Sequence, residues 1–108
     1  GGLSRRRSAM ANSVGNSGRF ISGEKTVTSA GTAEAIEADD IVHAVTIIAK
    51  AANAGQVYVG GSDVASSTND GLDAGDQLSL ESAYGIKLSD LYLDVGTSGE
   101  GVDFYGMK

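Results

Sequence analysis

The stretch DDIVHAVTIIAKAAN, residues 39–53, decides the fold class of this 108-residue chain, because it is compatible with two secondary structures. Apolar residues at helical spacing would line one face of a helix over residues 38–52, begun by Asp39 or Asp40 and ended by Gly55. Against the helix stand six β-branched residues, whose side chains lose rotamer freedom in a helix and suit a sheet: Ile41, Val42, Val45, Thr46, Ile47 and Ile48. We therefore predict a strand over about residues 42–52, with the helix as the alternative.

Downstream of this stretch, short strand patterns alternate with glycine turns. A turn at residues 53–55 leads into QVYV, residues 56–59, where Val57 and Val59 would face one side. A polar loop at residues 62–76 precedes QLSLES, residues 77–82, in which leucine alternates with polar residues. Two further strand patterns follow, KLSDLYLDV at residues 87–95 and VDFYGMK at residues 102–108. We expect the apolar positions of these segments to face the core, with Val64 and Leu72 anchoring the loop.

Upstream, the segment EKTVTSAGTAEAI, residues 24–36, predicts a hairpin, because threonine and valine favour a sheet and Gly31 can supply the turn. Six to eight closely spaced short strands indicate a sandwich or a small barrel. We predict an all-β fold, a single compact antiparallel β-sandwich over residues 24–108.

Residues 1–23 have a different composition, rich in Gly, Ser, Asn and Arg, and predict an extended N-terminal arm with no core of its own. Residues 1–19 carry four arginines and no acid, whereas residues 20–108 carry four lysines and fourteen acids, so the net charges are +4 and −10. An acidic body argues against nucleic-acid binding, and the basic arm suits an acidic partner, which includes a neighbouring copy. The predicted contact residues are Leu3, Arg5, Arg6, Arg7, Met10, Arg19, Phe20 and Ile21.

The chain has no cysteine, no proline and no apolar run near the ~20 residues of a membrane span, so we expect no disulfide and no membrane partner. The loop residues Asn69, Asp70, Asp73 and Asp76 are oxygen ligands of the kind that Ca²⁺ prefers, but their spacing does not fit an EF-hand loop. The same residue types also form ordinary turns. The single histidine, His43, has no second ligand or nucleophile near it in the pattern. We predict no enzyme activity, no metal and no cofactor, with a calcium-dependent adhesion domain as an alternative.

Four segments follow one another in an order that resembles a known family: TVTSAGTAEAI (26–36), VTIIAKAANAGQVYVGGSDV (45–64), GLDAGDQLSL (71–80) and LSDLYLDVGTSGEGVDFYGM (88–107). The pattern is similar to a small β-domain of structural proteins in tailed-bacteriophage virions, and it covers residues 25–107. One departure is Ala74, where such proteins often have proline. The resemblance does not include the arginine-bearing arm.

The resemblance implies a virion component of the capsid decoration (cement) or head-fibre type. A decoration protein on the capsid surface would bind the major capsid protein and stabilise the assembled shell through the arm and the sandwich edges. The resemblance further implies a homotrimer. The alternative function is a tail or head-fibre module that binds a receptor.

Overall fold

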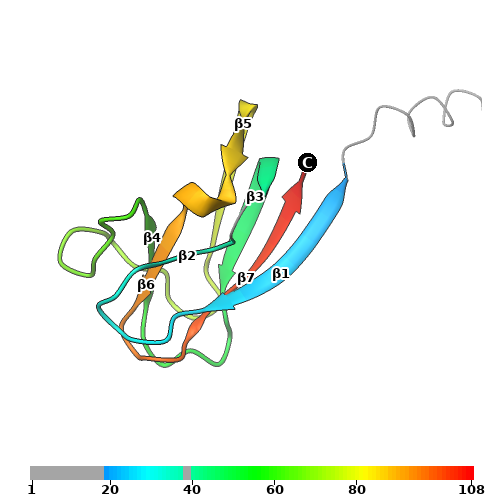
Figure 1. Cartoon of the computed structure of the whole chain (residues 1–108). Coiled ribbons are helices and arrows are strands. Elements are labelled where there is room, and N and C mark those ends of the chain that lie inside the picture. Colours follow the sequence, from blue (N-terminus) through cyan, green and yellow to red (C-terminus); the bar gives the residue numbers. More distant parts are fainter. Residues whose placement is uncertain (1–18, 38–39) are drawn as a thin grey trace, which may run out of the picture.

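The computed structural model describes residues 19–37 and 40–108, and this part of the chain is all-β (Figure 1). A short 3-10 turn, Leu88–Asp90, precedes the sixth of the seven strands found there. In chain order the strands are β1 (Phe20–Thr26), β2 (Glu34–Ala35), β3 (Ile41–Ala49), β4 (Val57–Gly60), β5 (Gln77–Lys87), β6 (Tyr92–Val95) and β7 (Gly101–Met107).

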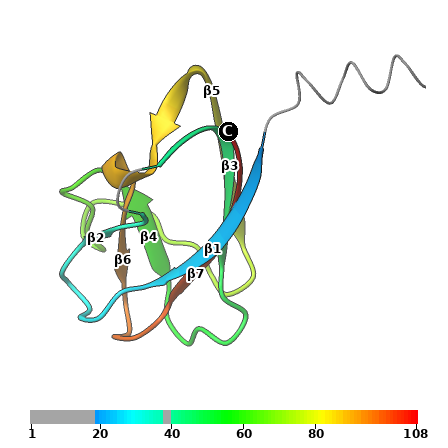
Figure 2. The ribbon, with the colours of Figure 1, turned by 45° about the vertical axis from the view of Figure 1, so that its right-hand side comes forward.

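The strands form two antiparallel sheets that face one another (Figure 2). The larger sheet has the order β1-β7-β3-β5, and the smaller has the order β2-β6-β4. Every pairing within these sheets is antiparallel. The predicted antiparallel β-sandwich is therefore confirmed.

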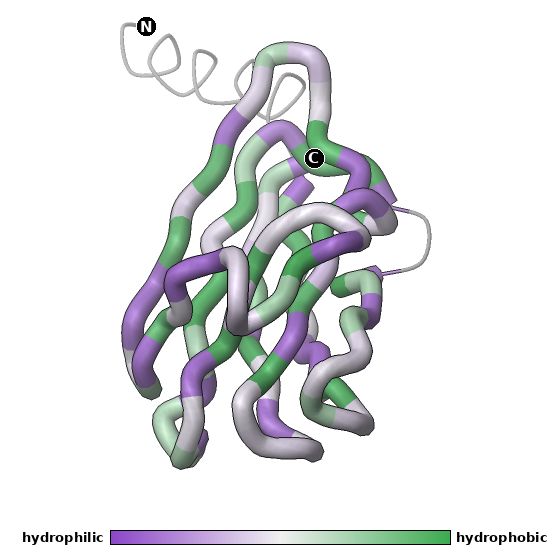
Figure 3. Tube along the Cα trace, turned by 90° about the vertical axis from the view of Figure 1, so that its left-hand side faces the viewer, coloured by the Kyte–Doolittle hydropathy of each residue, from purple (hydrophilic) through white to green (hydrophobic). Residues whose placement is uncertain are grey.

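Strand β3 is the strand predicted within residues 39–53, so the helix alternative is wrong. From Val45 onward its buried residues alternate with more exposed ones, as a strand with one face on the core requires. Hydrophobic residues recur in this way along several strands, separated by more hydrophilic ones (Figure 3). The strand ends at Ala49, three residues before the predicted end. Residues 50–53 close a turn instead, in which the Asn53 N–H donates to the Lys50 carbonyl oxygen.

The core lies between the two sheets and takes apolar side chains from both. Fully burying an aliphatic or phenylalanine side chain stabilises the fold by roughly 1.5–3 kcal/mol, so these residues are the main source of stability. Val64 is buried as predicted for a loop anchor, and Leu72, the other predicted anchor, packs against the core. The cluster contains Val27, Ile36, Val42, Val45, Ile47, Ala49, Val57, Leu88, Leu93, Val95, Val102 and Phe104.

The predicted hairpin over residues 24–36 is wrong. Strand β1 pairs with β7, and β2 pairs with β6 in the other sheet, so residues 27–33 cross between sheets. Gly31 has a φ of +91°, a conformation that favours glycine, and its N–H donates to the Asp94 carboxylate. Threonine, valine and glycine signal a strand and a turn equally well in both arrangements, and only the distant strand β7 decides between them.

Strand β1 begins at Phe20, so the last four residues of the predicted arm are part of the sandwich. The register from Phe20↔Met107 to Thr26↔Gly101 continues through the whole strand. The arm residues Leu3, Arg5, Arg6, Arg7 and Met10 lie outside the described residues.

Candidate functional site

The outer face of the four-stranded sheet, turned away from β2, β4 and β6, arranges its side chains in rows across the strands. The row at the start of β1 contains Phe20, Met107, Ala44 and Glu81, one from each strand in spatial order. The next row contains Ser22, Tyr105, Thr46 and Ser79. Alternate residues of each strand share a face, so these two rows form one continuous surface.

An apolar patch, formed by Phe20, Ala44, Tyr105 and Met107, occupies this part of the outer face. Phe20 is 65% exposed, and Tyr105 and Met107 are each 42% exposed. The Phe20 and Tyr105 rings stack with centroids 6.2 Å apart and an interplanar angle of 25°. Together with Val45, Thr46 and Gly106, the patch lines a shallow hollow of about 170 Å³. A surface of this kind presents aromatic and methionine side chains, which are enriched in protein interfaces.

Beside the patch, β5 leaves the sheet in an excursion, which we call the β5 tip (residues 82–85). The register passes from Ala44↔Glu81 to Val42↔Ile86, so five steps on β5 match two steps on β3. Gly85, with φ +97°, helps to reverse the chain, and Tyr84 at the tip is 98% exposed. A second shallow hollow of about 450 Å³ lies between His43 and residues 81–83.

The exposed large hydrophobic side chains of the described residues thus gather in one region. All belong to the four-stranded sheet, at the end where the chain enters β1 and where the β5 tip projects (Figure 1). We call this end of the sandwich the arm end. They are Phe20, Ile41, Tyr84, Tyr105 and Met107.

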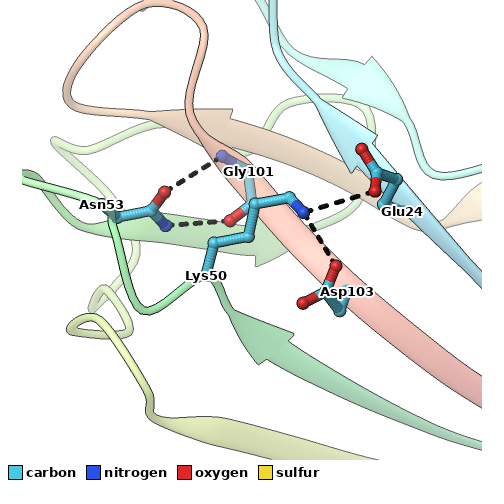
Figure 4. Close-up of polar contacts among 5 residues, drawn as sticks. All are labelled: Glu24, Lys50, Asn53, Gly101 and Asp103. Carbon is cyan, nitrogen blue, oxygen red and sulfur yellow. Dashed lines mark hydrogen bonds and ion pairs between the residues drawn. The ribbon is translucent and has the colours of Figure 1, made fainter.

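The opposite half of the outer face is polar, and its side chains form ion pairs and hydrogen bonds with neighbouring residues of the sheet and turns (Figure 4). Lys50 Nζ lies 2.8 Å from Asp103 Oδ1 and 3.6 Å from Glu24 Oε2. The hydrogen bond to Asp103, strengthened by the nearby negative charges, raises the pKa of Lys50. Asn53 Nδ2 donates to the Gly101 carbonyl oxygen at 2.8 Å. This ion-paired cluster limits the apolar patch to the half of the face near the arm.

Three of the predicted contact residues lie within the described part of the chain, and they do not share one surface. Phe20 lies on the apolar patch, and its role as a contact residue stays a prediction. Ile21 is turned to the other side of β1 and packs against the core. Arg19 is exposed, and its carbonyl oxygen accepts a hydrogen bond from the Lys108 N–H at 2.8 Å.

Sequence reasoning did not single out Tyr105 and Met107 as surface residues. The signal was present in VDFYGM, because period-2 alternation around a buried Phe104 places both residues on the outer face. Tyr84 had no comparable signal, since the excursion of β5 interrupts the alternation.

Three of the four loop residues considered as calcium ligands accept hydrogen bonds from nearby residues. Asp76 Oδ2 accepts from the Asp73 N–H at 3.0 Å, and Asp73 Oδ1 accepts from Gln56 Nε2 at 2.9 Å. Asn69 Oδ1 accepts from the Thr68 hydroxyl at 2.9 Å. Within residues 19–37 and 40–108, no group of three or more His, Cys, Asp or Glu side chains is arranged to hold a metal ion. The same residues include no helix that is long and apolar enough to span a bilayer.

Comparison of the chain with models of protein families, with curated proteins and with solved structures gives no match. Its function must therefore be argued from the outer face and the sequence.

Proposed function

We propose that this chain is a structural protein of a tailed-bacteriophage virion, a capsid decoration protein that binds and stabilises the assembled shell. The observation that carries the proposal is the gathering of exposed apolar side chains at the arm end of the four-stranded sheet. Single exposed apolar residues are normal on soluble proteins, but a contiguous patch marks a contact surface. The resemblance over residues 25–107 supplies the class of assembly.

The mechanism is mass action. A protein that binds the assembled shell, and binds its separate components poorly, stabilises the shell by RT ln(1 + [L]/Kd), which is about 2.7 kcal/mol at 100 times Kd. The role requires a rigid body and a contact surface and no chemical group that turns over a substrate. Two packed sheets provide the rigid body, and the apolar patch provides aromatic anchors of the type that dominate binding energy.

One observation favours the alternative, a tail or head-fibre module. Tyr84 projects from the β5 tip with 98% of its side chain exposed, beside the hollow next to His43. An exposed aromatic at a projecting tip is suited to contacting a separate receptor.

One experiment decides between the two roles: cryo-electron microscopy and quantitative mass spectrometry of phage particles that carry this chain. A decoration protein is present in a fixed, high ratio to the major capsid protein and gives sandwich density over the shell. Density confined to the tail or to sparse fibres supports the alternative and overturns decoration, and absence from the particle overturns both.

A matched pair of variants links the role to the surface. Tyr105→Asp places a charge in the apolar patch and should lower the occupancy of the particle. Ser66→Asp adds the same charge on the exposed loop at residues 61–72 and should leave occupancy unchanged. Equal occupancy for both variants, with folding verified by circular dichroism, would show that the patch does not attach the chain.

A further inference from the structure

We propose that residues 1–18 of one copy dock across the apolar patch of a second copy, so that the chain assembles head to tail through its own basic segment. The inference rests on the proposed function only in treating the outer face as a protein contact.

Net charge selects the occupant. Residues 19–108 carry one arginine, four lysines and fourteen acids, a net charge of −9. Two such bodies repel one another, so the direct apposition of two outer faces is opposed by long-range electrostatics. Residues 1–18 carry Arg5, Arg6 and Arg7 and no acid, and are the one large block of positive charge in the sequence.

The chemistry of the face matches the chemistry of that segment. The patch is apolar and hollowed, and its row continues across the sheet to Glu81, which forms no ion pair with any described residue. The segment offers isolated apolar residues, Leu3, Met10 and Val14, among glycine, serine, alanine and asparagine. Small residues on either side let a chain lie close to a shallow surface, while its larger side chains enter the hollow. An arginine of the segment can then pair with Glu81 at the margin of the patch.

Reach and direction favour a neighbour over the same molecule. Eighteen extended residues span up to about 60 Å, whereas four strands spaced about 4.8 Å apart cover roughly 15 Å. The segment is therefore long enough to cross a sheet and bridge to another copy. The Lys108 N–H to Arg19 carbonyl bond extends the β1–β7 pairing past Phe20↔Met107, so the chain at residue 19 continues along the strand axis. Docking on its own patch would require an immediate reversal.

Each copy then donates one segment and offers one face. Such a heterologous contact closes into a ring when the rotation between copies allows it, and otherwise forms an open chain.

Sedimentation equilibrium of the full chain tests the proposal with two defective variants. The donor variant carries Arg5→Glu, Arg6→Glu and Arg7→Glu, and the acceptor variant carries Thr46→Arg, which places a long cation in the hollow. The wild-type chain should self-associate, with at least a tenfold weaker association at 500 mM than at 50 mM NaCl. Each variant alone should be monomeric, and the control Ser66→Arg should associate like the wild-type chain.

Mixing the two variants gives the decisive result. The donor variant keeps an intact face and the acceptor variant keeps an intact segment, so an equimolar mixture should form a heterodimer and nothing larger. A monomeric mixture overturns the proposal, because docking on the same molecule and symmetric face-to-face pairing both predict that mixing restores nothing. A donor variant that still associates also overturns it, since another surface must then be the partner. These measurements use the purified chain, so they can fail while the virion role stands, and the virion role can fail while they succeed.

Discussion

The two ends of the sandwich are held in different ways. At one end, which we call the turn end (residues 27–33, 50–56 and 96–100), acidic side chains accept hydrogen bonds from turn backbone. Glu34 accepts from the Thr28 N–H at 2.7 Å, and Asp94 from the Gly31 N–H at 2.8 Å. Glu100 accepts from the N–H groups of two successive residues at 2.6 and 2.9 Å. At the arm end, by contrast, large apolar side chains are exposed and the β5 tip projects.

The difference indicates that stability and binding depend on different ends of the sandwich. A chain without proline or cysteine cannot stiffen its turns with rings or disulfides, and carboxylate-to-backbone hydrogen bonds are charge-assisted and strong. The acids that fix the turn end also contribute to the negative charge of the body. Among residues 19–37 and 40–108, no carboxylate-to-backbone hydrogen bond is found at the arm end, where the apolar patch is exposed. We therefore expect substitutions at the turn end to change stability, and substitutions at the arm end to change binding.

The largest expected loss of stability comes from Gly101→Ala, at the start of β7 and directly after the turn end. An added Cβ would overlap the Lys25 carbonyl oxygen and lie 2.7 Å from the Thr26 Cα, and backbone atoms of a paired strand cannot move aside cheaply. We expect the free energy of unfolding to fall by about 3 kcal/mol in urea titrations. The control Gly61→Ala, where the nearest atom is 3.6 Å away, should change it by less than about 0.5 kcal/mol. Similar values for the two variants would mean that β1 and β7 do not approach closely at this point.

Asp94→Ala should follow, with a loss of about 2 kcal/mol. Asp94 is 2% exposed, and removal of its carboxylate leaves the N–H groups of Gly31 and Val95 without their acceptor. Thermal unfolding compared with Asp63→Ala, at an exposed loop position, isolates the effect of the buried acceptor. If the two variants have the same melting temperature, the segment at residues 27–33, which crosses between the sheets, is not held by Asp94.

A smaller effect is expected from acid. The Thr28 N–H, and then Lys25, lower the pKa of Glu34. A carboxyl whose pKa is lower in the folded chain contributes stability above the unfolded value of roughly 4.3, and that stability is lost as the pH falls through the folded pKa. Urea titrations at pH 7 and pH 3 should therefore show a smaller acid-induced loss in Glu34→Gln than in the wild-type chain. Glu37→Gln, at an exposed position, should keep the full loss. If Glu34→Gln loses as much stability in acid as the wild-type chain, the hydrogen bond from the Thr28 N–H to Glu34 does not stabilise the turn end.

The smallest change in stability is expected from Tyr84→Ala at the arm end. The side chain is 98% exposed and contributes no core contact, so the free energy of unfolding should stay within about 0.5 kcal/mol of the wild-type value. A loss above 1 kcal/mol in a urea titration would show that the β5 tip is part of the stabilising structure, and the contrast between the two ends would fail.

The sequence predicted the fold where the pattern was local and failed where the pairing was distant. β-branched residues in β3 and alternation in QLSLES depend on neighbours a few positions away, so both strands were found. Residues 24–36 looked like a hairpin because the pattern carries no information about β7, about eighty positions further along the chain. The arm boundary was placed too late for the same reason, since Phe20 and Ile21 become strand residues only through pairing with residues 106–107.

The candidate site was predicted only in part. Phe20 was identified from its isolated position in a polar segment, but Ile21 was assigned to the same surface, because no strand period was visible there. Tyr105 and Met107 needed the knowledge that their strand is central and has its buried face set by Phe104. A surface patch depends on which strands lie side by side, and a single sequence reveals this order weakly.

The position of β7 between β1 and β3 has a consequence for biosynthesis. Residues 20–26 pair only with β7, so β1 stays unpaired until translation has reached residue 101, and its pairing is complete only at residue 107. Long-range pairing of this kind slows folding and exposes strand edges to other chains. A polypeptide interrupted before residue 101 would lack the partner strand of β1, so residues 20–26 could not join the sheet.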